Sequence, residues 1–238
     1  MLNSIYNGDC IQFMKSMPDQ YIDLIITDPP YNIGDDNKRT KVGNKIMSNM
    51  DAWGEWDNYD KKEYDEFIFK ILQESFRILK DGSSFYMFTA REDNGFFIRK
   101  AIECGFLYKN QLAIIKENPL PRFNKNNYRS AFELCMYLTK GKPKTFNFIS
   151  QKMCNNVHKY LIGRKDSEHP TEKPLKFFEK VILISSNEGD IVFDPFMGSG
   201  TTAIACIRNN RYYIGCEISN EYCKMINKRI LDANMRLF

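Results

Sequence analysis

The segment Asp28-Pro29-Pro30-Tyr31 combines residue types that can hold a flat ring carrying an exocyclic amine. It directly follows the apolar run "IDLIIT", which has the pattern of a buried strand. The two prolines restrict φ and fix the direction of the chain where the strand ends. An amine on the ring can then donate hydrogens to the Asp28 carboxylate and the Pro29 carbonyl, while Tyr31 stacks on the ring. A purely structural turn capped by Asp28 is the alternative interpretation.

A second segment, "IVFDPFMGSGTTAIAC", has the pattern of a strand, a glycine turn and a helix. The strand ends at Asp194, the turn contains Gly198 and Gly200, and Glu217 ends the next apolar run. Glycines allow close backbone approach to a ligand, and the first N–H groups of a helix favour anionic groups. The spacing is typical of nucleotide cofactor binding. A nicotinamide cofactor or a turn without any ligand also fits, whereas a Walker A loop is excluded because no Gly-Lys-Ser/Thr follows.

The position of this unit in the chain predicts a rotated order of elements. Only 21 residues follow Glu217, so the remaining strands must come from earlier sequence. The run "SIYNGD" then supplies the neighbouring strand, and Asp194, Glu217 and Asp9 stand at three consecutive strand ends, with strand 22–27 next. Glu217 can accept from ribose hydroxyls and Asp9 from an adenine amine. Asp9 is equally a candidate N-cap for a helix over 10–17, and one carboxylate can do both.

The rest of the chain alternates strands with helices, which predicts a doubly wound α/β sheet in a single domain, residues 1–238. Two stretches, 34–60 and 141–168, are longer than plain connections require, and such loops are often functional. Residues 35–60 are expected to form a loop near the active site, and residues 118–168 are a candidate region for target recognition. Asp81-Gly82 is expected to end the first long helix, which begins near Tyr64. The expected strands are 22–27, 84–89, 111–116, 133–138, 191–194 and 212–216. Further helices are expected at 94–104, 174–186, 200–208 and 220–231.

Composition sets limits on the class of protein. The chain has 43% hydrophobic residues, no apolar run long enough to span a bilayer, and an opening unlike a signal peptide, so we expect a cytoplasmic protein without membrane association. Its seven cysteines form no CxxC pair and are expected to be reduced. With two histidines, a metal site has little support. The net charge of +4 is compatible with a polyanionic partner.

The motif "DPPY" followed far downstream by "DPFMGSGTT" resembles the amino-methyltransferases of DNA in their beta order, in which the catalytic motif precedes the cofactor motif. Segments "NGDC", "KENPLPR" and "HPTEKP" are similar to further segments of that family, so the resemblance extends over most of the chain. It implies a Rossmann-like, mostly parallel seven-stranded sheet with helices on both faces and a circularly permuted motif order. It also implies catalytic roles for Asp28, Pro29, Pro30 and Tyr31.

The same resemblance implies that S-adenosylmethionine is the cofactor. In "HPTEKP" it implies that Lys173 pairs with the methionine carboxylate of the cofactor, although a surface turn with Thr171 as a helix cap is equally compatible. The cofactor-binding residues implied in this way are Asp9, Cys10, Asp28, Thr171, Lys173, Asp194, Phe196, Gly198, Ser199, Gly200, Thr201, Thr202, Glu217 and Ile218.

The expected reaction is methyl transfer to N6 of a flipped adenine in duplex DNA, because relatives that modify N4 of cytosine more often carry Ser where Asp28 stands. N4-cytosine methylation, an RNA or protein substrate, and a non-catalytic DNA-binding protein on the same fold are the alternatives. A prokaryotic or phage origin, a homodimer and a cognate restriction endonuclease are further expectations from the resemblance.

Clusters of basic residues are candidates for phosphate contacts, although any single lysine can simply lie on a solvated face. Trp53 and Trp56 can close over the base or pack within their loop. The candidate DNA-binding residues are Lys38, Arg39, Arg122, Lys125, Arg129, Lys140, Lys142, Lys144, Lys159, Arg164 and Lys165.

Overall fold

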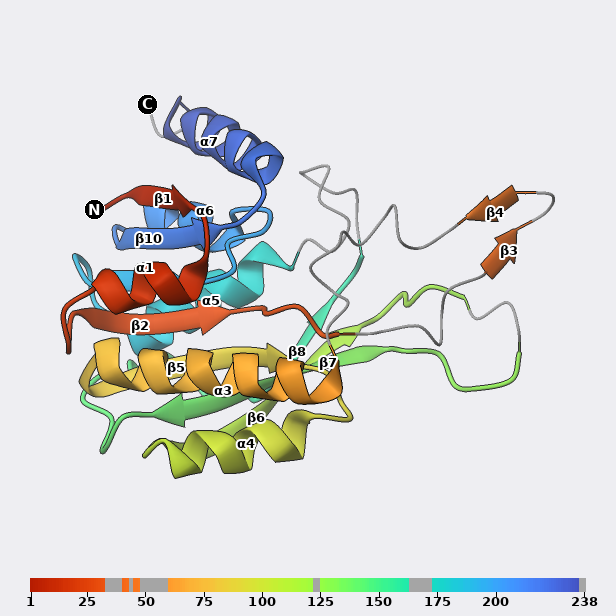
Figure 1. Ribbon diagram of the computed structural model, residues 1–238, viewed down its shortest axis with the longest axis horizontal. Coiled ribbons are helices and arrows are strands. Elements are labelled where there is room, and N and C mark those ends of the chain that lie inside the picture. The colour runs from red at the N-terminus through yellow and green to blue at the C-terminus, as the bar shows by residue number, and fades with distance from the viewer. Residues whose placement is uncertain (33–39, 43–44, 48–59, 122–124, 163–172, 236–238) are drawn as a thin grey trace.

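The computed structural model has an eight-stranded sheet at its centre (Figure 1). It describes residues 1–32, 40–42, 45–47, 60–121, 125–162 and 173–235. Strand β7 runs antiparallel to both of its neighbours, and the other pairs in this sheet are parallel. The order of strands is β1 (Ser4–Asn7), β10 (Tyr212–Glu217), β9 (Ile191–Asp194), β2 (Ile22–Thr27), β5 (Leu79–Thr89), β7 (Phe132–Thr139), β6 (Leu107–Lys116) and β8 (Val157–Tyr160).

Helices cover both faces of the sheet, as the sequence predicted. Along β2, Ile22 and Ile25 belong to one buried cluster and Leu24 and Ile26 to the other, because successive side chains of a strand point to opposite faces. The first cluster contains side chains of α1 (Cys10–Ser16), α3 (Lys61–Ile78) and α4 (Asn94–Glu103); the second contains those of α5 (Leu175–Ser185), α6 (Thr201–Arg208) and α7 (Asn220–Met235). A separate antiparallel pair consists of β3 (Thr40–Val42) and β4 (Lys45–Met47).

The junction between α3 and β5 differs from the expectation. The helix ends at Ile78, and Asp81-Gly82 lies within β5, which begins at Leu79 rather than Ser84. Pairing with β2 passes from Ile22↔Leu79 to Leu24↔Ser84, so β5 bulges between these pairs. Gly82 occupies this bulge with φ +86. Its left-handed conformation therefore serves a strand irregularity, a use of glycine that local pattern does not separate from a helix stop.

The expected sheet of seven strands gains an eighth, β8, in the stretch that was expected to be a loop. This strand has only four residues, and they alternate between exposed and half-buried. It pairs in parallel with β6, from Ala113↔Val157 to Lys116↔Tyr160. So short an edge strand carries too little apolar periodicity to stand out in the sequence.

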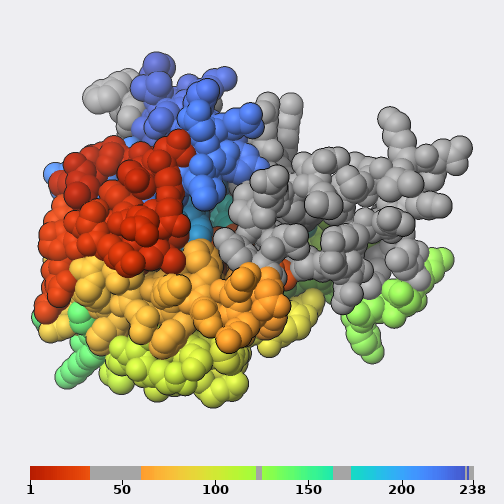
Figure 2. Space-filling model, viewed as in Figure 1, coloured from red at the N-terminus to blue at the C-terminus, as the bar shows by residue number. Residues whose placement is uncertain are grey.

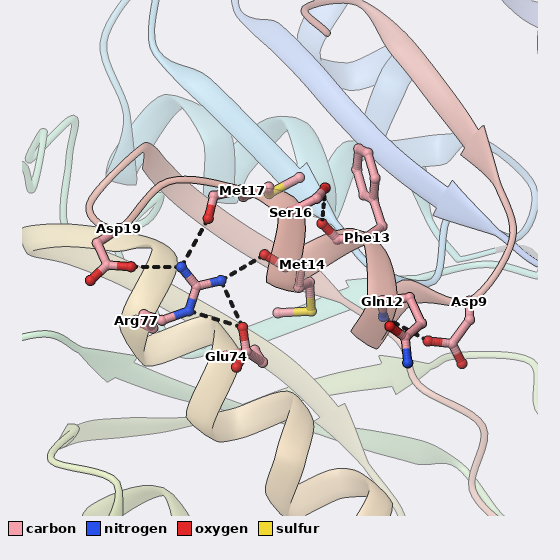
Figure 3. Close-up of polar contacts among 9 residues, drawn as sticks. All are labelled: Asp9, Gln12, Phe13, Met14, Ser16, Met17, Asp19, Glu74 and Arg77. Atoms are coloured by element: carbon pink, nitrogen blue, oxygen red, sulfur yellow. Dashed lines mark hydrogen bonds and ion pairs between the residues drawn. The ribbon is translucent and has the colours of Figure 1, made fainter.

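Arg77 joins α3 to the C-terminal end of α1 through hydrogen bonds (Figure 3). Its Nη2 donates to the carbonyl of Met14 at 2.6 Å and its Nη1 to that of Met17 at 2.9 Å. The guanidinium also pairs with Asp19 at 2.6 Å and Glu74 at 2.7 Å. These bonds satisfy the carbonyl of Met17 and give the carbonyl of Met14 a second donor beside the Met17 N–H, so they stabilise the point where the chain leaves α1.

Within the described ranges, the helices are too short or too polar to cross a bilayer. All seven cysteines are free thiols; Cys104 and Cys154 are half-buried and the others are buried. Burial of five of the seven thiols fits the expectation that most of them fill the core.

Candidate active site

Four acids stand at the carboxyl ends of four adjacent parallel strands. Asp9 follows β1, Glu217 ends β10, Asp194 ends β9 and Asp28 follows β2. This is the order predicted from the rotated arrangement of the motifs. Because the ends of parallel strands meet at one edge of a sheet, the glycine turn and the Asp28 motif face the same edge.

The glycine turn after β9 has the conformation that requires glycine. Gly198 and Gly200 have φ values of +52 and +81, and Gly200 is the N-cap residue of α6. A Cβ atom on Gly200 would lie 2.7 Å from Cγ2 of Ile226 in α7. The turn thus lets the chain enter α6 tightly packed against α7 and directs the first N–H groups of α6 to the edge where the acids stand. These features fit a nucleotide cofactor.

Asp194 fastens this turn to the strand that carries Asp28. Its Oδ1 accepts from the Thr27 hydroxyl at 2.8 Å and from the Phe196 N–H at 3.0 Å, while Oδ2 accepts from the Thr202 hydroxyl. The residue is 3% exposed, and burial raises the pKa of its carboxyl to about 6. Both oxygens therefore have protein partners, which gives Asp194 a structural role in holding the loop, and its contact with the cofactor stays a prediction.

Glu217 and Asp9 each have a structural role and can still contact a cofactor. Glu217 accepts from the Gly198 N–H and the Ser219 N–H, both at 2.9 Å, and burial raises the pKa of its carboxyl. Each oxygen keeps a lone pair that can accept a ribose hydroxyl. Asp9 is exposed and caps α1 by accepting from the Gln12 N–H at 2.8 Å (Figure 3). The alternative of an N-cap is therefore confirmed.

The other predicted cofactor residues differ in their exposure and in their contacts. Cys10 is 7% exposed, Phe196 is half-buried and its ring meets Phe67 edge-on, and Ile218 is 62% exposed. Asn7 was missed by the sequence reasoning: its side-chain amide donates to the carbonyls of Glu217 and Ile218 at 2.9 and 3.0 Å. Ser199 and Thr201 bond to each other through their hydroxyls at 3.0 Å, and Thr171 lies outside the described residues.

The Asp28 motif is held rigidly, as its prolines predicted. Asp28 Oδ1 accepts from the Tyr31 hydroxyl at 2.7 Å, and the carbonyl of Pro30 accepts from the Tyr64 hydroxyl at 2.7 Å. The Asp28 side chain is 22% exposed, and burial raises the pKa of its carboxyl. Tyr31 was expected to stack on a ring; its hydroxyl additionally orients Asp28, and the stacking stays a prediction.

Lys173 has protein partners that the sequence reasoning did not anticipate. Its Nζ lies 2.8 Å from Glu133 Oε2, 3.1 Å from Asp28 Oδ2 and 3.3 Å from the Tyr31 hydroxyl, and its contact with the carboxylate of the cofactor stays a prediction. Burial opposes its charge, yet these neighbours outweigh burial and raise the pKa of Lys173 well above its usual range. Lys173 is therefore the counter-ion of Asp28.

Glu133 and Lys116 are the residues that the sequence reasoning missed here. Glu133 Oε1 pairs with Lys116 Nζ at 2.5 Å, and Lys116 and Lys173 together hold the pKa of Glu133 at about 2 despite its burial. Glu133 is the second residue of the apolar strand "FELCMYLT", and Lys116 ends "LAIIK". A charged residue in a largely buried strand is a usable signal, because such residues are rarely buried without a partner.

The predicted DNA-binding residues fall into separate groups. Lys125 and Arg129 are exposed in the loop between β6 and β7, which projects from the end of the sheet where Asp28 stands, called the active edge below (Figure 2). Lys159 is exposed on β8. By contrast, Lys140 donates to the Leu79 carbonyl. Lys144 lines a hollow of about 190 Å³ with Asp23 and Asp190, which lie where β2 and β9 begin.

That hollow is at the edge of the sheet opposite Asp28, so the placement does not support contacts of Lys140, Lys142 and Lys144 with DNA bound at Asp28. Arg91, missed in the sequence, follows β5 at the active edge and lies over the Phe132 ring at 5.7 Å. The remaining candidates and the two tryptophans lie outside the described residues: Lys38, Arg39, Arg122, Arg164, Lys165, Trp53 and Trp56.

Comparison with known proteins agrees with this geometry. Type II methyltransferase M.HinfI of Haemophilus influenzae is 33% identical over 250 residues, covering 96% of this chain and 68% of that protein. The crystal structure of an M1.HpyAVI–SAM complex matches with a TM-score of 0.70 at 25% identity, covering 95% of this chain and 97% of that one. PvuII DNA methyltransferase, described as cytosine-N4-specific, matches with a TM-score of 0.75 at 21% identity over 98% of this chain and 91% of that one, which shows the fold.

The family model described as DNA methylase matches residues 22–228, which include both the Asp28 motif and the glycine turn. S-adenosylmethionine is accordingly the cofactor of this protein. The chain belongs to the N6/N4 DNA methylase family and is a site-specific, S-adenosylmethionine-dependent DNA methyltransferase.

Proposed function

We propose that this protein methylates N6 of adenine in duplex DNA. The observation that carries the proposal is the hydrogen bond of 2.8 Å between Thr27 and Asp194, because it joins the strand that ends in Asp28 to the strand that ends in the glycine turn. An amine held by Asp28 would therefore stand beside the cofactor loop. Such alignment of two reactants accounts for a large part of enzymatic rate enhancement.

The chemistry asked of Asp28 is the activation of a weak nucleophile. The lone pair of an adenine amine is delocalised into the ring. Hydrogen bonds from its two N–H groups to the Asp28 carboxylate and the Pro29 carbonyl favour the localised form and stabilise positive charge developing on nitrogen. S-adenosylmethionine supplies an electrophilic methyl group. Direct attack leaves a proton that solvent can take, so the chain needs no covalent intermediate.

Adenine is favoured over cytosine by the residue at position 28. Both bases carry an exocyclic amine, so the geometry of Asp28 serves either. The resemblance to enzymes of the adenine type rests on the carboxylate, since Ser is more common at this position in cytosine enzymes. N4-cytosine methylation is the second candidate.

The test is transfer of labelled methyl groups from S-adenosylmethionine to unmethylated duplex DNA of mixed sequence, followed by nucleoside analysis. N6-methyladenine at a defined site is the expected product. N4-methylcytosine would overturn the choice of base and leave the roles of Asp28 and Pro29 intact. Absence of label in DNA, with label in RNA or protein, would overturn DNA as the substrate of this chain.

The base must leave the stack to reach Asp28, at a cost of a few kcal/mol. Stacking on Tyr31 and phosphate contacts from Lys125, Arg129, Lys159 and Arg91 would offset that cost. Tyr128, which is 93% exposed in the same loop as Lys125 and Arg129, adds an aromatic surface for contact with bases. A homodimer and a cognate restriction endonuclease remain proposals that follow from the family alone.

The double change Lys125→Ala and Arg129→Ala should weaken DNA binding because it removes two exposed positive charges beside the active edge. The expected result is a several-fold higher KM for DNA at unchanged kcat. The slope of log KM against the logarithm of the salt concentration should fall by about 2, one for each lost charge. Steady-state rates at several salt concentrations measure both quantities. The change Lys15→Ala, at an exposed position of α1, is the control, and an equal effect there would contradict a localised DNA contact.

A further inference from the structure

Four charged side chains of alternating sign form a chain that ends at Asp28. Lys116 lies 2.5 Å from Glu133, Glu133 lies 2.8 Å from Lys173, and Lys173 lies 3.1 Å from Asp28. Their side chains are between 9% and 22% exposed. Two positive and two negative charges leave the group neutral, which makes its partial burial tolerable. The chemistry proposed for Asp28 uses neither Glu133 nor Lys116.

Asp28 needs a counter-ion because its environment opposes ionisation. Burial raises its pKa, Lys173 lowers it, Glu133 raises it, and the Tyr31 hydroxyl donates to it. The other titratable groups around the cluster are Asp194, Cys135 and Tyr160. Burial and a nearby carboxylate raise the pKa of each, while Lys173 opposes the rise at Cys135 and Tyr160. Lys173 is the cation that keeps the Asp28 carboxylate ionised.

A counter-ion bonded tightly to Asp28 would compete with the amine of the substrate. The carboxylate offers about four acceptor positions, and Tyr31 and Lys173 already use two of them. The Lys173–Glu133 distance of 2.8 Å is within the range of strong charge-assisted bonds, whereas the Lys173–Asp28 distance of 3.1 Å is longer. Glu133 therefore takes the stronger bond of Lys173.

We infer that Glu133 is a positioning residue for methyl transfer: anchored by Lys116, it takes the shorter bond of Lys173, so that Lys173 compensates the charge of Asp28 while acceptor positions on that carboxylate stay available to the substrate amine. The role of Glu133 in methyl transfer rests on the proposed function of Asp28, whereas the effect of Glu133 and Lys173 on the charge of Asp28 does not. The contrasting role for Lys173, binding of the cofactor carboxylate, predicts different results for the same variants.

The variants Glu133→Gln and Lys173→Met should move the titration of Asp28 in opposite directions. Glutamine has the shape of Glu133 without its negative charge, so the pKa of Asp28 should fall. Loss of the Lys173 cation should raise it. Titration of the carboxyl ¹³C signal of Asp28 in the cofactor-free protein measures this directly, with Asp28→Asn used to assign the signal. Glu117→Gln, at an exposed acid directly after β6, is the matched control and should cause no shift.

Turnover provides the second readout. Ionised Asp28 is the active form, so the acidic limb of the profile of kcat/KM against pH should move to lower pH in Glu133→Gln and to higher pH in Lys173→Met. The kcat of Glu133→Gln at its optimum pH should also be about tenfold lower. Without the carboxylate of Glu133, Lys173 makes its strongest bond with Asp28 and competes there with the substrate amine. In both variants the Kd for S-adenosylmethionine should equal that of the wild type. A role in folding alone would not shift the limb in opposite directions.

An unchanged Asp28 titration in Glu133→Gln would overturn the inference, and this isosteric variant suffices if Lys173→Met does not fold. A tenfold weaker cofactor affinity with a fixed acidic limb would overturn it in favour of a cofactor role for Lys173. If the wild-type protein methylates no DNA, the proposed function fails, yet opposite shifts of the Asp28 signal would still support the network, because that measurement needs no turnover.

Discussion

Replacement of Asp28 by asparagine should lower kcat by about two to three orders of magnitude, the usual cost of removing one group that stabilises charge in a transition state. Asparagine has the same shape but no charge, and its single acceptor oxygen cannot serve Tyr31, Lys173 and the substrate amine together. The change also leaves Lys173 with Glu133 as its remaining carboxylate partner. Single-turnover methyl transfer with saturating DNA and cofactor measures the loss.

A matched substitution at the other end of the same strand separates chemistry from folding. Asp23 of β2 pairs with Lys80 at 2.7 Å and accepts from the Ile191 N–H at 3.0 Å, so Asp23→Asn should lower thermal stability and leave kcat at its wild-type value. Asp28→Asn should bind S-adenosylmethionine with near wild-type affinity. Equal loss of kcat in the two variants, or full activity of Asp28→Asn, would contradict the role given to Asp28.

Replacement of Gly200 by alanine should weaken cofactor binding by about tenfold or more, equivalent to ~1.4 kcal/mol. Two effects combine at this residue. An L-residue at φ +81 costs about 1–2 kcal/mol, and the added Cβ would meet Ile226 at 2.7 Å, so α7 or the glycine turn must shift. Because we expect the turn to present its backbone to the cofactor, its displacement should cost affinity. Calorimetric titration with S-adenosylmethionine measures the change.

Gly189 offers a matched control for this prediction. It has the same φ of +81, and no atom lies within 4 Å of the Cβ that alanine would add. Gly189→Ala should therefore lose stability through backbone strain alone and keep the cofactor affinity of the wild type. The rise in melting temperature on cofactor addition should be smaller in Gly200→Ala than in Gly189→Ala. Equal rises would show that the turn does not contact the cofactor.

Local pattern in the sequence was enough for the elements that carry the site. Strands β2 and β9 have the expected bounds, and the expectation that Asp9, Glu217, Asp194 and Asp28 end adjacent strands is confirmed. Buried parallel strands are continuous apolar runs, and glycines and prolines mark where those runs must stop. Local pattern was not enough where one residue type has two uses, as with Gly82, which lies in a bulge of β5 instead of at a helix end.

The sequence by itself determined the order of the motifs and the placement of the acids at the strand ends, because these follow from local periodicity and chain order. Only the tertiary structure decided that Lys173 pairs with Asp28 and Glu133, and that Lys140 and Lys144 lie beside the opposite edge of the sheet. Asp28 and Lys173 are far apart in the chain and meet because the sheet and α5 bring their segments together. Charge pairing at such separations depends on packing, which residue spacing does not encode.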